Sequence, residues 1–169
     1  MCVFLCVLCP AQSGGLDVDV PNRDSVTAVM LGQGWGFLVA IAPNIEDAQC
    51  MLEARDKAKN KALAVWSLSA YQAKPSKTIT AKHAGFQRIK GRLLSFQRSS
   101  SYWWLRLEGD VVLRVEQKSW ALFNQKSLAA AIGSDVLVSG WLVDRGWQVA
   151  SKRARYMLLL SHSAHFEVL

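Results

Sequence analysis

The run Phe86-Gln-Arg-Ile-Lys-Gly-Arg-Leu-Leu-Ser-Phe96 decides the fold of this 169-residue chain. It has the composition of a strand, with Gly91 at its centre, where a tightly coiled strand would bend. A short polar segment, Arg98–Ser101, follows, and then an aromatic run, Tyr102–Leu107. The two runs together predict a β-hairpin.

The alternation of apolar and polar residues continues beyond this hairpin. It predicts three further strands, over Val111–Glu116, Asp135–Val143 and Trp147–Leu160, the last interrupted near residues 152–155. After the first of them, Trp120–Ile132 has the composition of a short helix, with Gly133 as its C-cap. Three strands, a helix and two strands is the order of an OB-fold. The predicted fold class is therefore α+β, mainly β, with a five-stranded OB-fold barrel at the C-terminus and a helical segment before it.

Residues 83–169, the predicted OB-fold domain, carry most of the positive charge. The whole chain has a net charge of +7 and a sequence pI of about 9.5. Residues 83–169 contain twelve Lys and Arg against six Asp and Glu. An excess of this kind favours polyanionic partners, so single-stranded DNA or RNA is the expected partner and no membrane is expected.

Residues 1–15 are predicted to be a leader that is disordered or loosely packed. Its apolar run, Met1–Cys9, is too short to span a bilayer and lacks the basic residues of a signal peptide. A cytoplasmic location is favoured, while secretion and the periplasm stay open because residues 11–13 loosely resemble a cleavage site. The cysteines, at positions 2, 6, 9 and 50, lack the spacing of a zinc site or a disulfide framework.

Residues 16–66 predict a series of short elements. These are a strand over Leu16–Val20, a helix over Val26–Gly32, a strand over Phe37–Ile41 and a long helix over Ile45–Val65 that Trp66 ends. Residues 67–82 are rich in Ser, Lys, Ala and Thr and contain Pro75. They are predicted to be a linker or a tether lying on the surface.

Two stretches of this N-terminal half resemble the C-terminal third of the thermonuclease (staphylococcal nuclease-like) family. They are Val26-Thr-Ala-Val-Met-Leu-Gly-Gln-Gly-Trp-Gly-Phe37 and Glu53-Ala-Arg-Asp-Lys-Ala-Lys-Asn-Lys-Ala-Leu-Ala-Val-Trp66, with Pro43-Asn44 between them. Residues 16–66 are thus interpreted as a partial thermonuclease-like segment. The domain at 83–169 resembles the additional C-terminal OB domain that some bacterial members carry.

The resemblance implies a nuclease homologue without its catalytic residues. In the family, aspartates hold calcium, a glutamate activates water and two arginines clamp the phosphate, all upstream of the matched region. Ser13-Gly14-Gly15 stands where one of these arginines would be. Metal-assisted phosphodiester hydrolysis needs all of these parts. No catalytic residue and no metal ligand is therefore predicted, and calcium is expected only if a complete site exists upstream.

The predicted nucleic-acid surface lies on the barrel, because OB-folds bind single strands on strands two and three with aromatic and basic side chains. The candidates that share one face of a strand or form a basic cluster are Arg88, Lys90, Arg92, Tyr102, Trp104, Arg106, Arg114, Lys152, Arg153 and Arg155. In the alternative interpretation, one of Trp103 and Trp104 is core and the other caps an exposed edge.

Two other functions stay open. In the first alternative, the chain is the C-terminal portion of a calcium-dependent nuclease. In the second, it is an interaction module in which a homodimer or a protein partner covers the incomplete nuclease-like segment. Metal binding at Asp17 and Asp19 or at His162 and His165 is disfavoured, since two side chains alone make a weak ligand set.

Overall fold

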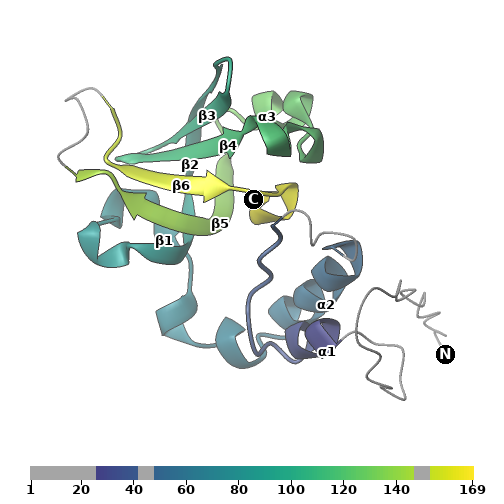
Figure 1. The fold of residues 1–169 in the computed structure, drawn as a ribbon. Coiled ribbons are helices and arrows are strands. Elements are labelled where there is room, and N and C mark those ends of the chain that lie inside the picture. Colours follow the sequence, from purple (N-terminus) through teal and green to yellow (C-terminus); the bar gives the residue numbers. More distant parts are fainter. Residues whose placement is uncertain (1–25, 42–47, 147–152) are drawn as a thin grey trace. The chain divides into compact units, whose positions relative to one another are not determined.

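The computed structural model describes residues 26–41, 48–146 and 153–169 (Figure 1). The predicted leader, the strand at 16–20 with its two aspartates, and Lys152 lie outside the described residues. The chain divides into two units, of which the first includes residues 26–38 and 48–69 and the second includes 39–41 and the described residues from 70 onward. In the described parts of the chain, no helix is long and apolar enough to cross a bilayer.

The second unit is a closed barrel. Its strands are β2 (Gly85–Arg98), β3 (Tyr102–Leu107), β4 (Val111–Glu116), β5 (Asp135–Asp144) and β6 (Tyr156–Leu160). They pair in the order β2-β3-β4-β6-β5, and β5 pairs again with β2, which closes the ring (Figure 1). The β4–β6 pair is parallel and the others are antiparallel. This is the five-stranded mixed barrel of an OB-fold, so the predicted fold class is confirmed.

Alternation along the strands builds the barrel core. Leu105 and Leu107 of β3 and Leu113 and Val115 of β4 are fully buried, whereas the residues between them are polar or aromatic. Trp103 belongs to this core, with its ring stacked 5.1 Å from that of Trp120. Burying these side chains in the barrel is the main source of its stability.

The connection between β4 and β5 closes one end of the barrel. It consists of a 3-10 segment, Gln117–Leu122, and the helix α3 (Gln125–Ala130). The Asn124 side chain caps α3 by accepting hydrogen bonds from two backbone N–H groups, at 3.0 and 3.2 Å. A helical connection is therefore confirmed, but the cap divides the single helix that was predicted over Trp120–Ile132.

Residues 74–79 pack on the barrel, so the linker prediction for residues 67–82 is wrong in this part. The strand β1 (Lys74–Pro75) pairs in parallel with β2, and Ile79 is buried in the core. The two segments approach closely at Gly91, where a Cβ atom would collide with the Ser76 hydroxyl. Three 3-10 turns complete the segment, at Ser69–Tyr71, Ser76–Thr78 and Ala81–His83.

The first unit is helical. It contains α1 (Val26–Gly32) and α2 (Ala48–Asn60), which contact each other, and a 3-10 turn at Ala64–Trp66. The predicted helix at 26–32 is confirmed. The longer helix ends at Asn60 rather than Val65, since Ala62 and Ala64 have positive φ angles of 49° and 43°. Trp66 packs edge-on against Phe37, with the ring centroids 5.0 Å apart.

Two short segments differ from the predicted strands. Phe37–Ile41 forms no strand, and only Ile41 takes part in an isolated bridge. At the C-terminus, β6 begins at Tyr156 and not at Trp147, and residues 147–152 lie outside the described residues. A 3-10 turn, Ser163–His165, then leads into the strand β7 (Phe166–Val168), which pairs with β5.

Candidate nucleic-acid interface

The outer face of β3 and β4 carries an aromatic and basic surface. In the antiparallel register, Tyr102 lies opposite Glu116, Trp104 opposite Arg114, and Arg106 opposite Val112. The intervening Trp103 points into the core and is only 4% exposed, whereas Trp104 is half-buried. The two tryptophans therefore have different roles, and Trp104 is the one on the outer face.

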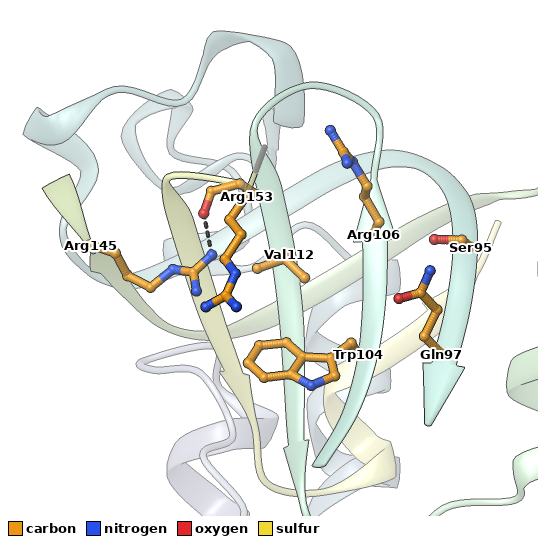
Figure 2. Close-up of a pocket in the computed structure, with 8 residues that line it drawn as sticks. Ser95, Gln97, Trp104, Arg106, Val112, Arg145 and Arg153 are labelled. Carbon is orange, nitrogen blue, oxygen red and sulfur yellow. Dashed lines mark hydrogen bonds between the residues drawn. The ribbon is translucent and has the colours of Figure 1, made fainter. Parts of the chain in front are cut away.

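This face is hollowed beside Trp104. The hollow has a volume of about 340 Å³ and is lined by side chains of β2, β3, β4 and the β5–β6 connection: Ser95, Gln97, Trp104, Arg106, Val112, Arg145, Arg153 and Ala154. We refer to it as the Trp104 hollow. Figure 2 shows the Arg145 and Arg153 side chains side by side next to Val112, with Arg106 and Gln97 on the other side. Three arginine side chains and one indole ring thus line the same hollow.

Arg145 is part of this hollow although its sequence context, Arg145-Gly146, indicated only a turn. Its guanidinium donates a hydrogen bond to the Ala154 carbonyl, and its Nε is buried without a hydrogen-bond partner among the described residues (Figure 2). Burial, together with the charges of Arg153 and Arg114, lowers the pKa of Arg145, while Asp110 acts in the opposite direction. The Arg145 guanidinium is therefore held close to the positive charges of Arg153 and Arg114.

The described lining of the hollow is basic and contains no carboxylate, although Asp110 lies near enough to act on Arg145. Arg106 and Arg153 are exposed, and within the described part of the chain neither has an ion pair. An apolar ring beside several uncompensated guanidinium groups fits a ligand with a flat base and an anionic group.

Tyr102 and Arg114 lie beside the Trp104 hollow on the same face. The Arg114 guanidinium lies 5.0 Å from the centre of the Tyr102 ring and pairs with Glu116 at 3.0 Å. The Tyr102 and Trp104 ring centroids are 5.7 Å apart. These contacts orient Arg114, which is therefore a held cation rather than a mobile one.

Arg155 supports the connection that carries Arg145 and Arg153. Its guanidinium makes two hydrogen bonds of 2.8 Å with the Asp144 carboxylate, and its backbone N–H donates to Asp110 at 2.9 Å. This pairing raises the pKa of Arg155 and lowers the pKa of Asp144. Because its charge is paired, Arg155 serves to position the loop.

Arg88, Lys90 and Arg92 lie elsewhere on the barrel. They belong to the first half of β2, which pairs with β5, whereas the second half pairs with β3. A register irregularity between Leu93 and Ser95 separates the halves. None of the three lines the Trp104 hollow. Arg88 donates to the Tyr71 carbonyl at 3.2 Å, and Arg92 donates to the Gly133 carbonyl at 2.8 Å.

The two C-terminal histidines have structural partners. His162 caps the 3-10 turn by accepting from the Ala164 N–H, and burial lowers the pKa of its imidazole. His165 is buried, accepts a 2.9 Å hydrogen bond from the Ala40 N–H and contacts the Ser139 hydroxyl at 3.2 Å. In the described residues, no group of three or more His, Cys, Asp or Glu side chains is placed to hold a metal ion.

No family model matches the chain, and no curated protein matches it. Among solved structures it is similar to OBody AM3L09 bound to hen egg-white lysozyme, at 12% identity and a TM-score of 0.42, covering 58% of this chain and 94% of that chain. It is also similar to asparaginyl-tRNA synthetase from Pyrococcus horikoshii, at 14% identity and a TM-score of 0.41, covering 59% and 23% of the two chains. The aspartyl tRNA synthetase from Entamoeba histolytica is similar at 12% identity and a TM-score of 0.40, covering 60% of this chain and 22% of that chain. The chain spans less than a quarter of either synthetase, and similarity at this level concerns fold class alone.

Proposed function

We propose that this protein binds single-stranded DNA or RNA on the outer face of β3 and β4. One base stacks on Trp104, and the neighbouring phosphates contact Arg106, Arg145 and Arg153. The observation that carries the proposal is the Trp104 hollow, in which an indole ring lies among guanidinium groups with no acidic residue in the described lining. A single strand offers both an unpaired base and a phosphate within one nucleotide, as this arrangement requires.

The position of the hollow supports the same proposal. OB-folds place single strands over their second and third strands, next to the loop between strands four and five. In this chain those elements are β3, β4 and the connection from β5 to β6, and all of them contribute side chains to the hollow. Stacking is tolerant of sequence because every base has a π-face, so binding with little sequence preference is expected.

The first test is binding of a fluorescent oligothymidylate of about 12 nucleotides, followed by anisotropy. Trp104→Ala should weaken binding by about 1–3 kcal/mol because a stacking surface is lost. Trp104→Phe should retain most of the affinity, since it keeps a π-face. Wild-type affinity in Trp104→Ala, or no binding by the wild-type protein, would reject the proposal.

The kinship with thermonucleases remains a separate hypothesis, based on the sequence resemblance of residues 26–66. We propose that this chain binds nucleic acid without cleaving it. The alternative is a calcium-dependent nuclease activity. Recovering the oligonucleotide after incubation with calcium and measuring its length decides between them, because intact product supports binding alone and shortened product supports hydrolysis.

A further inference from the structure

A row of outward side chains continues from Trp104 across the barrel. Trp104 lies opposite Arg114, Arg114 opposite Leu159, Leu159 opposite Trp141, and Trp141 opposite Phe86. The row runs perpendicular to the strands and passes over β3, β4, β6, β5 and β2. Its residues alternate with fully or nearly fully buried neighbours such as Leu113, Leu158 and Leu142, which confirms that the row faces outward.

The far end of the row contains a second hollow, about 370 Å³ in volume. Its lining includes Phe86, Trp141, Leu159 and also Arg114, which is the register partner of Trp104. Trp141 is 61% exposed, although an indole of this size normally buries most of its surface. A large exposed ring in an apolar hollow indicates a surface that a ligand covers.

One wall of this second hollow is formed by residues 39–41. Ala40 is held to the barrel by two hydrogen bonds, from its N–H to His165 at 2.9 Å and from the Ser161 hydroxyl to its carbonyl at 2.7 Å. Val39 and Ile41, on either side of Ala40, line the hollow. The hollow is therefore a built feature of the unit, with a backbone wall that is fixed by buried and half-buried side chains.

We infer that this second hollow, beside Trp141, takes a second base of the same single strand, a proposal that depends on the proposed function. Along the row, Trp104 and Trp141 are three inter-strand spacings apart, a path of about 14 Å around the barrel wall. The bound strand then crosses β4 and β6 between the two rings. This commits the occupant to single-stranded nucleic acid, because Arg114 of the second hollow lies opposite Trp104 of the first in the strand register, and each hollow presents a π-face.

The two hollows differ in charge, so substitutions in them should have different effects on the salt dependence of binding. In the second hollow Glu116 pairs with both Arg114 and Lys118, at 3.0 and 2.9 Å, so both cations already have a carboxylate partner and half of their charge is compensated. The second site therefore contributes stacking with little phosphate neutralisation. Affinity lost there should not alter the salt dependence of binding, because the salt slope counts neutralised phosphates.

The test compares Trp141→Ala with wild type on the oligothymidylate of about 12 nucleotides and on a thymidine dinucleotide. For the long strand we expect a loss of about 5- to 150-fold with an unchanged salt slope, and Trp141→Phe should restore most of the affinity. In spectra of the indole N–H groups, the dinucleotide should shift the signal of Trp104 alone, whereas the long strand should shift those of Trp104 and Trp141. Leu94→Ala, which truncates an exposed side chain outside the row, is the matched control and should bind as wild type does.

Three results would overturn the inference. The first is wild-type affinity for the long strand in Trp141→Ala. The second is an equal loss on the long strand and the dinucleotide, which would mean that Trp141 acts through the fold. The third is a drop in oligomeric mass in Trp141→Ala with unchanged nucleic-acid binding, which would identify a second copy of the chain as the occupant. Failure of the proposed function itself looks different, because wild type would then bind neither oligonucleotide.

Discussion

The two arginine-rich regions of the barrel, the Trp104 hollow and the first half of β2, have similar composition and different chemistry. In the first half of β2, Arg88 and Arg92 donate to backbone carbonyls that belong to neighbouring segments. By contrast, Arg106 and Arg153 have no ion pair among the described residues and line the same hollow as the Trp104 indole. The guanidinium groups of the two regions thus differ in what they already bind.

A basic strand face is therefore not by itself a binding site. An arginine that satisfies a carbonyl contributes to the fold, and a ligand must compete with that hydrogen bond before it can use the charge. Arginines that are held close together without a carboxylate repel one another, and an incoming phosphate relieves this repulsion. We therefore expect substitutions in the Trp104 hollow to weaken binding, and substitutions in the first half of β2 to lower stability.

The largest expected effect is on the salt dependence of binding. The double variant Arg106→Ala/Arg153→Ala should lower the slope of log affinity against log salt by about 1.4, since each lost phosphate contact on a single strand accounts for about 0.7. The matched variant Arg88→Ala/Arg92→Ala removes the same formal charge and should leave the slope close to that of wild type. Anisotropy titrations over a range of salt concentrations measure both. Equal changes in the two variants would mean that charge alone, and not the hollow, determines binding.

A smaller and opposite effect is expected in stability. Arg92→Ala should lower the free energy of unfolding by about 0.5–1.5 kcal/mol, because the 2.8 Å hydrogen bond to the Gly133 carbonyl is lost. Arg106→Ala should stay within about 0.5 kcal/mol of wild type, as is usual for an exposed residue without such a partner. Urea denaturation followed by circular dichroism gives both values. A larger loss in Arg106→Ala than in Arg92→Ala would contradict the distinction between the regions.

The strand order could be predicted from the sequence because it depends on local patterns. Alternation, turn residues and the helical connection placed β3 and β4 at their observed bounds and β2 and β5 within two residues of theirs. The alternation also put Trp103 and Trp104 on opposite faces. Which of the two lies inside depends on the apolar residues that share its face, and Leu105 and Leu107 place Trp103 in the core.

The site was less predictable, because barrel closure and loop packing determine it. The irregularity between Leu93 and Ser95 divides β2 between two partners, which separates Arg88, Lys90 and Arg92 from the Trp104 hollow. Arg145 lines the hollow with its guanidinium donating to the carbonyl of Ala154, where the chain returns after the β5–β6 connection. Sequence spacing reveals neither feature. The first depends on which strands pair with β2, and the second joins the two ends of one loop.

The smallest expected effect is a pH dependence of stability that binding should not share. Burial lowers the pKa of His162 in the folded state, so the unfolded chain takes up a proton more readily. Stability from this source is complete above the ordinary histidine pKa of about 6.5 and is lost as the pH falls through the lower folded value. His162→Asn keeps an acceptor for the Ala164 N–H without a titrating group, so its free energy of unfolding should fall less than that of wild type between about pH 7.5 and 5.5. Guanidinium groups in general do not lose their proton in proteins, so the salt slope of binding should not change while the protein remains folded. Identical pH profiles of stability in wild type and His162→Asn would show that the buried imidazole does not contribute.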